Sequence, residues 1–231
     1  MKYDGLNRLI ETTLPEGNKV VLTYDANNSV LTKTYVPKSG SGLSNIQFVY
    51  TYDSTWAKVK TVVDGNSKTT TFSYDPVNGN LLTVTKPLVG GLTPQAVFTY
   101  NARGQLLTVT DETGIVTKLN YDVATEKLTS AVADYSLVGG HLNLTTSFGY
   151  DAVGNLNSIT DPNTNQTTFV FDNERRRTKV TSAAPFNFVT NVAFDVNGSV
   201  TSVQRQLTSA PTWQTTSFTY TISDKILTSV D

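Results

Sequence analysis

The chain has 231 residues, with 18 Lys and Arg against 19 Asp and Glu, one histidine and no cysteine. A net charge of −1 provides no basic field of the kind that drives nucleic-acid binding. The absence of cysteine excludes disulfides, thiolate catalysis and Cys-type zinc sites. No apolar run reaches the roughly 18 residues that a membrane helix needs. We therefore expect neither nucleic-acid binding nor a membrane span.

Threonine fills much of the place that charged residues usually take. Charged residues make up 16% of the chain, against about 25% in average domains, and the sequence contains 38 threonines. Thr, Tyr and Phe are enriched in strands. The composition therefore predicts an all-β protein.

An aromatic residue followed by Asp or Asn recurs along the chain, and we call this aromatic residue the anchor of a repeat. In a tenth, degenerate copy the anchor precedes Thr221. The ten anchors are Tyr3, Tyr24, Tyr52, Tyr74, Tyr100, Tyr121, Tyr150, Phe171, Phe194 and Tyr220. Their spacing mostly alternates between short and long, within 21 to 29 residues. Such a period indicates a repeat architecture, and we expect residues 1–231 to be a single array.

Each anchor is predicted to end a strand. From Tyr24 onward an apolar residue lies two positions before the anchor, and small or polar residues lie between, which is the two-residue period of a strand. After the anchor, Asp or Asn can cap a turn, and Asn or Gly four or five residues on accepts a positive φ. An apolar residue then begins the next strand. Trp56, which lies where Asn or Gly is expected, and the segment 174–177, which lies where a turn is expected, depart most from this pattern.

At the far end of each hairpin we expect a second turn. In chain order these turns are the tight turn 15–18, the loop 36–46, the turn 64–66, the loop 86–95, the turn 111–114, the loop 133–145, the turn 161–164 and the loop 205–215. Each unit is thus one hairpin, and ten units give about 20 antiparallel strands.

So many strands predict a curved wall. Twisted open sheets rarely exceed about ten strands without curling, and barrels of 16–18 strands already enclose a channel. We expect a hollow architecture in which anchors such as Tyr52, Tyr74, Tyr100, Tyr121 and Tyr150 form ring ladders between hairpins. The alternative is a β-propeller, because two units span about 48 residues, the length of a four-stranded blade.

Two segments carry a family resemblance. The stretch Tyr3-Asp4-Gly5-Leu6-Asn7-Arg8-Leu9, and the form from Tyr150 to Leu156 that continues to Asn163, resemble the YD repeats of the Rhs superfamily. That superfamily includes Rhs polymorphic toxins, the C component of Tc toxins, wall-associated YD-repeat proteins and teneurins. The resemblance implies a spiralling β-shell that encloses an attached polypeptide, and a protein that is secreted or on the cell surface of bacteria.

Few residues suggest chemistry. His141 is the one histidine and lies in a loop, so a triad or a His-based metal site is not expected. Residues 25–28 and 161–165 only faintly resemble calcium loops, and they lack the Glu at position twelve. We predict no enzyme activity, no metal and no cofactor. The basic cluster Arg175, Arg176 and Arg177 is expected to be a solvated turn, with an anion or acidic-partner site as the alternative.

The expected function is structural. We predict a shell segment, a fragment of a longer wall, whose partners are the rest of the same shell or an enclosed polypeptide. Open sheet edges would also permit self-association. The alternative is a carbohydrate- or protein-binding surface module whose loops carry the contacts, since loops on a rigid scaffold often carry recognition. The candidate contact residues in these loops and in the basic cluster are Tyr135, His141, Trp213, Arg175, Arg176 and Arg177.

Overall fold

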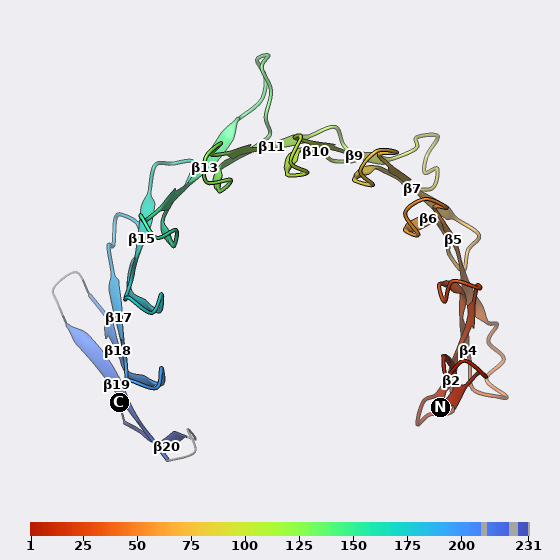
Figure 1. Cartoon of the computed structure of the whole chain (residues 1–231), viewed down its shortest axis with the longest axis horizontal. Coiled ribbons are helices and arrows are strands. Elements are labelled where there is room, and N and C mark those ends of the chain that lie inside the picture. Colours follow the sequence, from red (N-terminus) through yellow and green to blue (C-terminus); the bar gives the residue numbers. More distant parts are fainter. Residues whose placement is uncertain (209–211, 222–225, 231) are drawn as a thin grey trace. The chain divides into compact units, whose positions relative to one another are not determined.

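The computed structural model describes residues 1–208, 212–221 and 226–230. These residues contain twenty strands, each antiparallel to the strands with which it pairs, and no helix (Figure 1). No helix among them is therefore long or apolar enough to cross a membrane. The chain divides into two compact units, Met1–Val116 and Thr117–Asp231.

The first unit contains ten strands, each paired antiparallel with its neighbours in the sequence. Pairing is continuous from β1 to β10, so the sheet is not divided into blades. The strands are β1 (Lys2–Tyr3), β2 (Leu9–Thr13), β3 (Lys19–Tyr24), β4 (Val30–Val36), β5 (Ile46–Tyr52), β6 (Val59–Val63), β7 (Thr69–Tyr74), β8 (Leu81–Thr85), β9 (Gln95–Tyr100) and β10 (Leu106–Thr110).

The second unit repeats this arrangement. Its pairing runs without a break from β11 to β20. The strands are β11 (Val116–Tyr121), β12 (Leu128–Ala133), β13 (Leu144–Tyr150), β14 (Leu156–Thr160), β15 (Gln166–Phe171), β16 (Arg177–Thr181), β17 (Val189–Phe194), β18 (Val200–Gln206), β19 (Trp213–Tyr220) and β20 (Ile226–Val230). Continuous pairing excludes a propeller, whose sheets break after every four strands.

Every anchor ends a strand, as the sequence predicts. At all ten anchors the register with the following strand shifts, because the partner strand carries one extra residue. In β3 and β4, for example, Thr23 pairs with Thr32 but Tyr24 pairs with Val30. This two-against-one arrangement is a β-bulge, which bends a strand and increases its twist.

The two faces of the sheet differ. In β3, Leu22 and Tyr24 are half-buried while Thr23 between them is exposed, and β5, β9, β15, β17 and β19 end in the same alternation. We call the side of Thr23 the hydroxyl face. There, residues one position before an anchor pair across strands through side-chain hydrogen bonds of 2.6–2.7 Å, as in Thr23–Thr32, Thr51–Thr61, Ser73–Thr83, Thr99–Thr108 and Thr219–Thr228.

The described residues of each unit build no conventional hydrophobic core. Among the described residues Val132 is the one apolar side chain that counts as buried, at 9% exposed. No second layer covers the strands within either unit (Figure 1). The strands are therefore stabilised mainly by their sheet neighbours, as in repeat proteins whose units contact only adjacent units.

Candidate functional site

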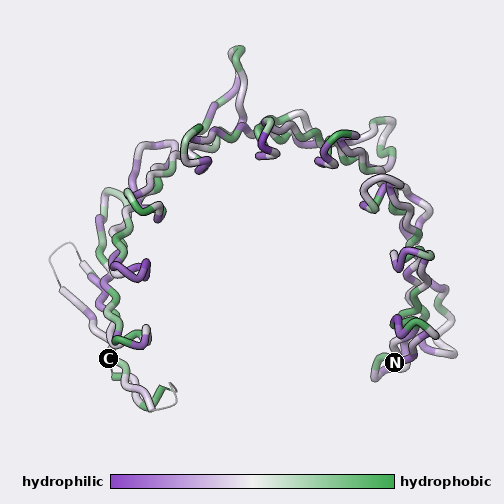
Figure 2. Tube along the Cα trace, in the orientation of Figure 1, coloured by the Kyte–Doolittle hydropathy of each residue, from purple (hydrophilic) through white to green (hydrophobic). Residues whose placement is uncertain are grey.

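The most regular feature outside the strands is the row of turns that follow the anchors, which we call anchor turns. Within each unit these turns lie at one edge of the ribbon and the second turns at the other (Figure 1). Many of the anchor turns are hydrophilic, whereas the tip of the loop between β12 and β13 is apolar (Figure 2).

The Asp after the anchor builds the turn. Asp25 Oδ1 accepts hydrogen bonds of 2.8 Å from the backbone amides of Asn27 and Ser29. One carboxylate oxygen thus satisfies two backbone donors of the turn. The same capping is made by Asp4, Asp53, Asp75, Asn101, Asp151, Asp172 and Asp195. This confirms the predicted bond to the amide two residues ahead.

Hydrogen bonds lower the pKa of three carboxyls that follow an anchor, those of Asp4, Asp53 and Asp122. The largest cause at Asp4 is the backbone amide of Arg8, and at Asp53 it is the backbone amide of Trp56. At Asp122 the hydroxyl of Thr125 contributes most to the lowered pKa. A carboxylate that accepts several donors is stabilised in its charged form. The turns are therefore best formed when these aspartates are ionised.

The copies that depart from the pattern form the same turn. Residues with positive φ include Asn7, Asn28, Gly79 and Gly104, as expected, but also Ala57 at 52° and Arg175 at 62°. Only small or Asx residues accept this region readily. Trp56 lies against Gly79 of the next anchor turn, where an added Cβ would be 2.7 Å from the indole Cδ2.

Successive anchors are joined by the tyrosine hydroxyl. Tyr52 donates a hydrogen bond of 2.7 Å to the carbonyl of Val30, which is the residue paired with the preceding anchor, Tyr24. The same bond is made by Tyr24 to Leu9, Tyr74 to Val59, Tyr150 to Leu128 and Tyr220 to Val200. Among the described residues, these hydrogen bonds join successive anchors in place of the expected ladder of stacked rings. The described ring pairs are Tyr35–Phe48 and Phe186–Phe188, and neither pair joins two anchors.

A second link uses the last residue of the anchor turn, which we call the clasp position. In four copies this residue is basic and its charge lies over the ring of the next anchor. The distances to the ring centroid are 4.8 Å for Arg8 and Tyr24, 5.5 Å for Lys58 and Tyr74, 4.8 Å for Lys127 and Tyr150, and 4.8 Å for Arg176 and Phe194. This is the geometry of a cation–π contact.

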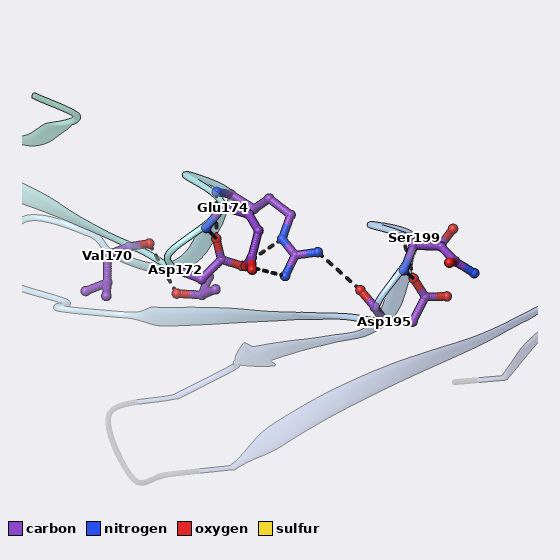
Figure 3. A network of polar contacts seen from close by, with 8 residues as sticks. Val170, Asp172, Glu174, Asp195 and Ser199 are labelled. Atoms are coloured by element: carbon purple, nitrogen blue, oxygen red, sulfur yellow. Dashed lines mark hydrogen bonds and ion pairs between the residues drawn. The ribbon is translucent and has the colours of Figure 1, made fainter. Parts of the chain in front are cut away.

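Arg176 shows the full set of clasp contacts. Its Nε donates to Asp172 Oδ2 at 2.7 Å, and its Nη1 donates to the carbonyl of Asp195 at 3.1 Å. Figure 3 shows Asp172 and Glu174 on one turn and Asp195 on the next, connected through these contacts. Arg8 does the same with Asp4 Oδ2 and the carbonyl of Asp25, at 2.7 and 3.1 Å. The clasp ties neighbouring turns together.

The clasp residues were not identified from the sequence. The expectation that Arg176 is solvated is wrong, because it bridges two turns. Arg177 lies over the Phe169 ring at 5.5 Å, and Arg175 is exposed with a positive φ. The missed signal is a basic residue five or six positions after an anchor, just before the first residue of the next strand.

The other candidate contact residues do not converge with the basic cluster. Trp213 begins β19 and is 40% exposed, so it is a strand residue and not part of a loop. Tyr135 is half-buried beside Lys118, whose Nζ lies 4.6 Å from the ring centroid. His141 Nδ1 is 2.6 Å from Asp134 Oδ1 within its own loop. No group of three or more His, Cys, Asp or Glu in the described part of the chain could hold a metal.

Comparison with known proteins finds one repeat family. Residues 150–184 match the family model RHS Repeat. That segment contains the anchors Tyr150 and Phe171, and the same turn and strand pattern recurs in the other copies. Residues 150–184 therefore carry an RHS repeat. No curated protein matches the sequence.

Solved Tc toxin structures share the fold. The crystal structure of TcdB2-TccC3 without its hypervariable C-terminal region matches with a TM-score of 0.75 and 16% identity over 96% of this chain. The complex TcdB2-TccC3-Cdc42 gives 0.72 and 16% over 94%, and the Photorhabdus luminescens Tc holotoxin pore gives 0.72 and 17% over 93%. This chain covers only 12–13% of those chains.

Proposed function

We propose that this chain is a non-catalytic wall segment of an Rhs-type β-shell that encloses or presents an attached toxin or effector polypeptide. The observation that carries the proposal is a one-layer sheet in each unit, with Val132 as the one buried apolar residue described. A single layer has two accessible faces, so it is suited to separating two compartments rather than to packing around a core.

The repeat links support the same role. Hydroxyl bonds and basic clasps join neighbouring hairpins without the help of a second layer. One face carries paired hydroxyls and the other carries half-buried rings, so the two sides of the wall offer different chemistry to what they touch. A half-buried aromatic face can gain contact area from an adjacent polypeptide. The partners would be the rest of the shell and its cargo.

A secreted or cell-surface location in a bacterial setting goes with this role, as in the Tc toxins that share the fold. The strand β20 pairs with β19, and all its residues are exposed. A strand edge of this kind is a template for another strand. We expect further wall, or a second copy, to pair there.

The two faces allow a direct test in the natural gene product that contains this chain. The photo-crosslinker p-benzoylphenylalanine is placed at Thr51, on the hydroxyl face, and in a second variant at Phe72, on the opposite face. The proposal expects crosslinks to an enclosed polypeptide from one of these faces and not from the other. Crosslinks to the cargo from neither face, or from both equally, would contradict a separating wall.

A second candidate function is recognition at the second-turn edge. The loops there expose Leu88, Val89 and Leu92 in the first unit and Leu137 and Val138 in the second, with exposed fractions of 61–90%. Carbohydrate or cell-surface protein would be the partner of a binding module. Glycan-array binding that is lost in Trp213→Ala or Tyr135→Ala would favour this function, and its absence would favour the shell.

A further inference from the structure

The spaces between successive anchor turns fall into two kinds. Where the clasp position is basic, its side chain lies over the next anchor ring and fills the space, as Arg8 does between the turns at 4–8 and 25–29. At some turns where the clasp residue is uncharged, a cavity remains. The first unit contains such a cavity of about 290 Å³ between the turns at 25–29 and 53–58. Its clasp position is Ser29.

This cavity offers the groups that Arg8 uses one repeat earlier. Arg8 contacts the carboxylate of Asp4, the carbonyl of Asp25 and the ring of Tyr24. By the repeat, the corresponding groups around the cavity are the carboxylate of Asp25, the carbonyl of Asp53 and the ring of Tyr52, and all three residues line it.

The carboxylate and the ring are arranged for a cation. Asp25 Oδ1 caps its own turn, and no hydrogen bond to Oδ2 is found within the described ranges. Burial raises the pKa of Tyr52, and the charge of Asp25, which lines the same cavity, raises it further. The charge of Lys60 acts on Asp53, but Lys60 is not among the residues that line the cavity.

Two similar cavities are less suitable. The one between the turns at 151–155 and 172–176 has Asn155 at its clasp position, and the Asn155 amide already donates to Asp151 Oδ2 at 2.8 Å. The one between Asp195 and Tyr220 adjoins residues outside the described part of the chain. Of the two cavities that lie wholly between described anchor turns, only the one beside Ser29 has a second carboxylate oxygen with no partner among the described residues.

We propose that the cavity between Asp25 and Tyr52 is a binding site for an arginine side chain of another polypeptide segment, which takes the place that Arg8 occupies in the preceding repeat. The guanidinium would donate to the Asp25 carboxylate and to the carbonyl of Asp53 while stacking on Tyr52. A planar fork of donors suits one carboxylate and one carbonyl better than an ammonium does. This inference goes beyond the wall function, because the site lies within this chain and its arginine binding can be tested without the rest of a shell.

The test is a titration of the isotope-labelled chain with N-acetyl-arginine amide, followed by NMR at constant ionic strength. We expect saturable amide shifts at Asn27, Ser29 and Asp53, with half-saturation on the order of 1 mM. The neutral citrulline analogue should produce no saturable shift at these positions. Shifts that are equal for arginine and citrulline, or no saturable shift for arginine, would overturn the proposal.

Two variants and a control locate the site. Ser29→Arg should fill the cavity from within and abolish the shifts, while Ser199→Arg, at the equivalent position in the second unit, should leave them unchanged. Asp25→Asn should weaken binding about tenfold, and it keeps the turn because Asn101 caps the same turn in another repeat. Unchanged binding in Ser29→Arg would contradict the assignment even if Asp25→Asn failed to fold.

Discussion

The hydroxyl of Tyr52 donates a 2.7 Å hydrogen bond to the carbonyl of Val30, the residue that pairs with the preceding anchor at the bulge. Since the partner strand carries an extra residue there, this carbonyl lies at an irregular point of the ladder. The next anchor supplies a donor to it. An anchor thus ends its own hairpin and also fastens the one before it.

Removal of that hydroxyl should destabilise the chain. In Tyr52→Phe the ring remains but the Val30 carbonyl loses a donor, so we expect the free energy of unfolding to fall by about 0.5–1.5 kcal/mol. Urea denaturation measures the change. Tyr3→Phe is the control, because the Tyr3 hydroxyl contacts only the Met1 sulfur, at 3.7 Å, among the described contacts. Equal effects of the two substitutions would contradict the role of the anchor hydroxyl.

The close approach of Trp56 to Gly79 gives a second prediction. Gly79→Ala places a Cβ 2.7 Å from the indole and requires alanine to adopt a φ of 74°. We expect a loss of more than about 1 kcal/mol, with a lower melting temperature in calorimetry. Gly5→Ala is the matched control, since an added Cβ there meets no atom within 4 Å. A melting temperature of Gly79→Ala equal to that of Gly5→Ala would be inconsistent with this packing.

The clasp should stabilise the second unit and respond to salt. Arg176→Met keeps the aliphatic stem but removes the donors to Asp172 and Asp195, and we expect a loss of about 1 kcal/mol at low ionic strength. High salt should reduce the difference from the unsubstituted chain. Arg175→Met, in the same turn, should cost less. Chemical denaturation at low and high salt measures both, and a larger effect at Arg175 would show that the clasp is assigned to the wrong residue.

Relief of backbone strain gives a stabilising prediction. Arg175 has a φ of 62° at a position that other turns fill with Gly or Asn. Arg175→Gly should raise the unfolding free energy by about 0.5–1 kcal/mol, because glycine adopts this region without a steric cost. The matched substitution Arg103→Gly lies in a turn whose positive φ is already at Gly104, and it should not stabilise. Thermal denaturation distinguishes the two.

Acid should weaken the anchor turns. The pKa values of Asp4, Asp53, Asp122 and Asp172 are lowered in the folded chain. A carboxyl whose folded pKa is lowered stabilises the fold above its ordinary pKa of about 3.9, and this contribution is lost as pH falls through the folded value. Urea midpoints should therefore be similar at pH 7 and pH 6 and fall below about pH 4. A midpoint that rises on acidification would contradict this linkage.

Much of the fold follows from the sequence because its signals are local. The two-residue alternation before each anchor, the Asx cap and the following Gly or Asn act within one hairpin, so strand ends and turns are predictable from them. Ala57 and Arg175 show that the turn forms even where those signals are weak, because the paired strands on either side impose it.

The links between hairpins are harder to predict. A tyrosine hydroxyl that binds a backbone carbonyl leaves no residue signature on the acceptor side, as Leu9 and Val30 illustrate. The clasp is obscured because anchor turns have two lengths, which places Arg8 five residues after its anchor and Lys58 six. Trp213 was assigned to a loop because its strand begins earlier than the sequence pattern indicates.

The most direct measurement of the central claim is a cryo-electron microscopy structure of the natural gene product that contains this chain. We expect residues 1–231 to form one layer of a hollow wall, with polypeptide density on one side and solvent on the other. A second sheet or helical layer packed against the strands of these hairpins, or a wall with no polypeptide on either side, would contradict it.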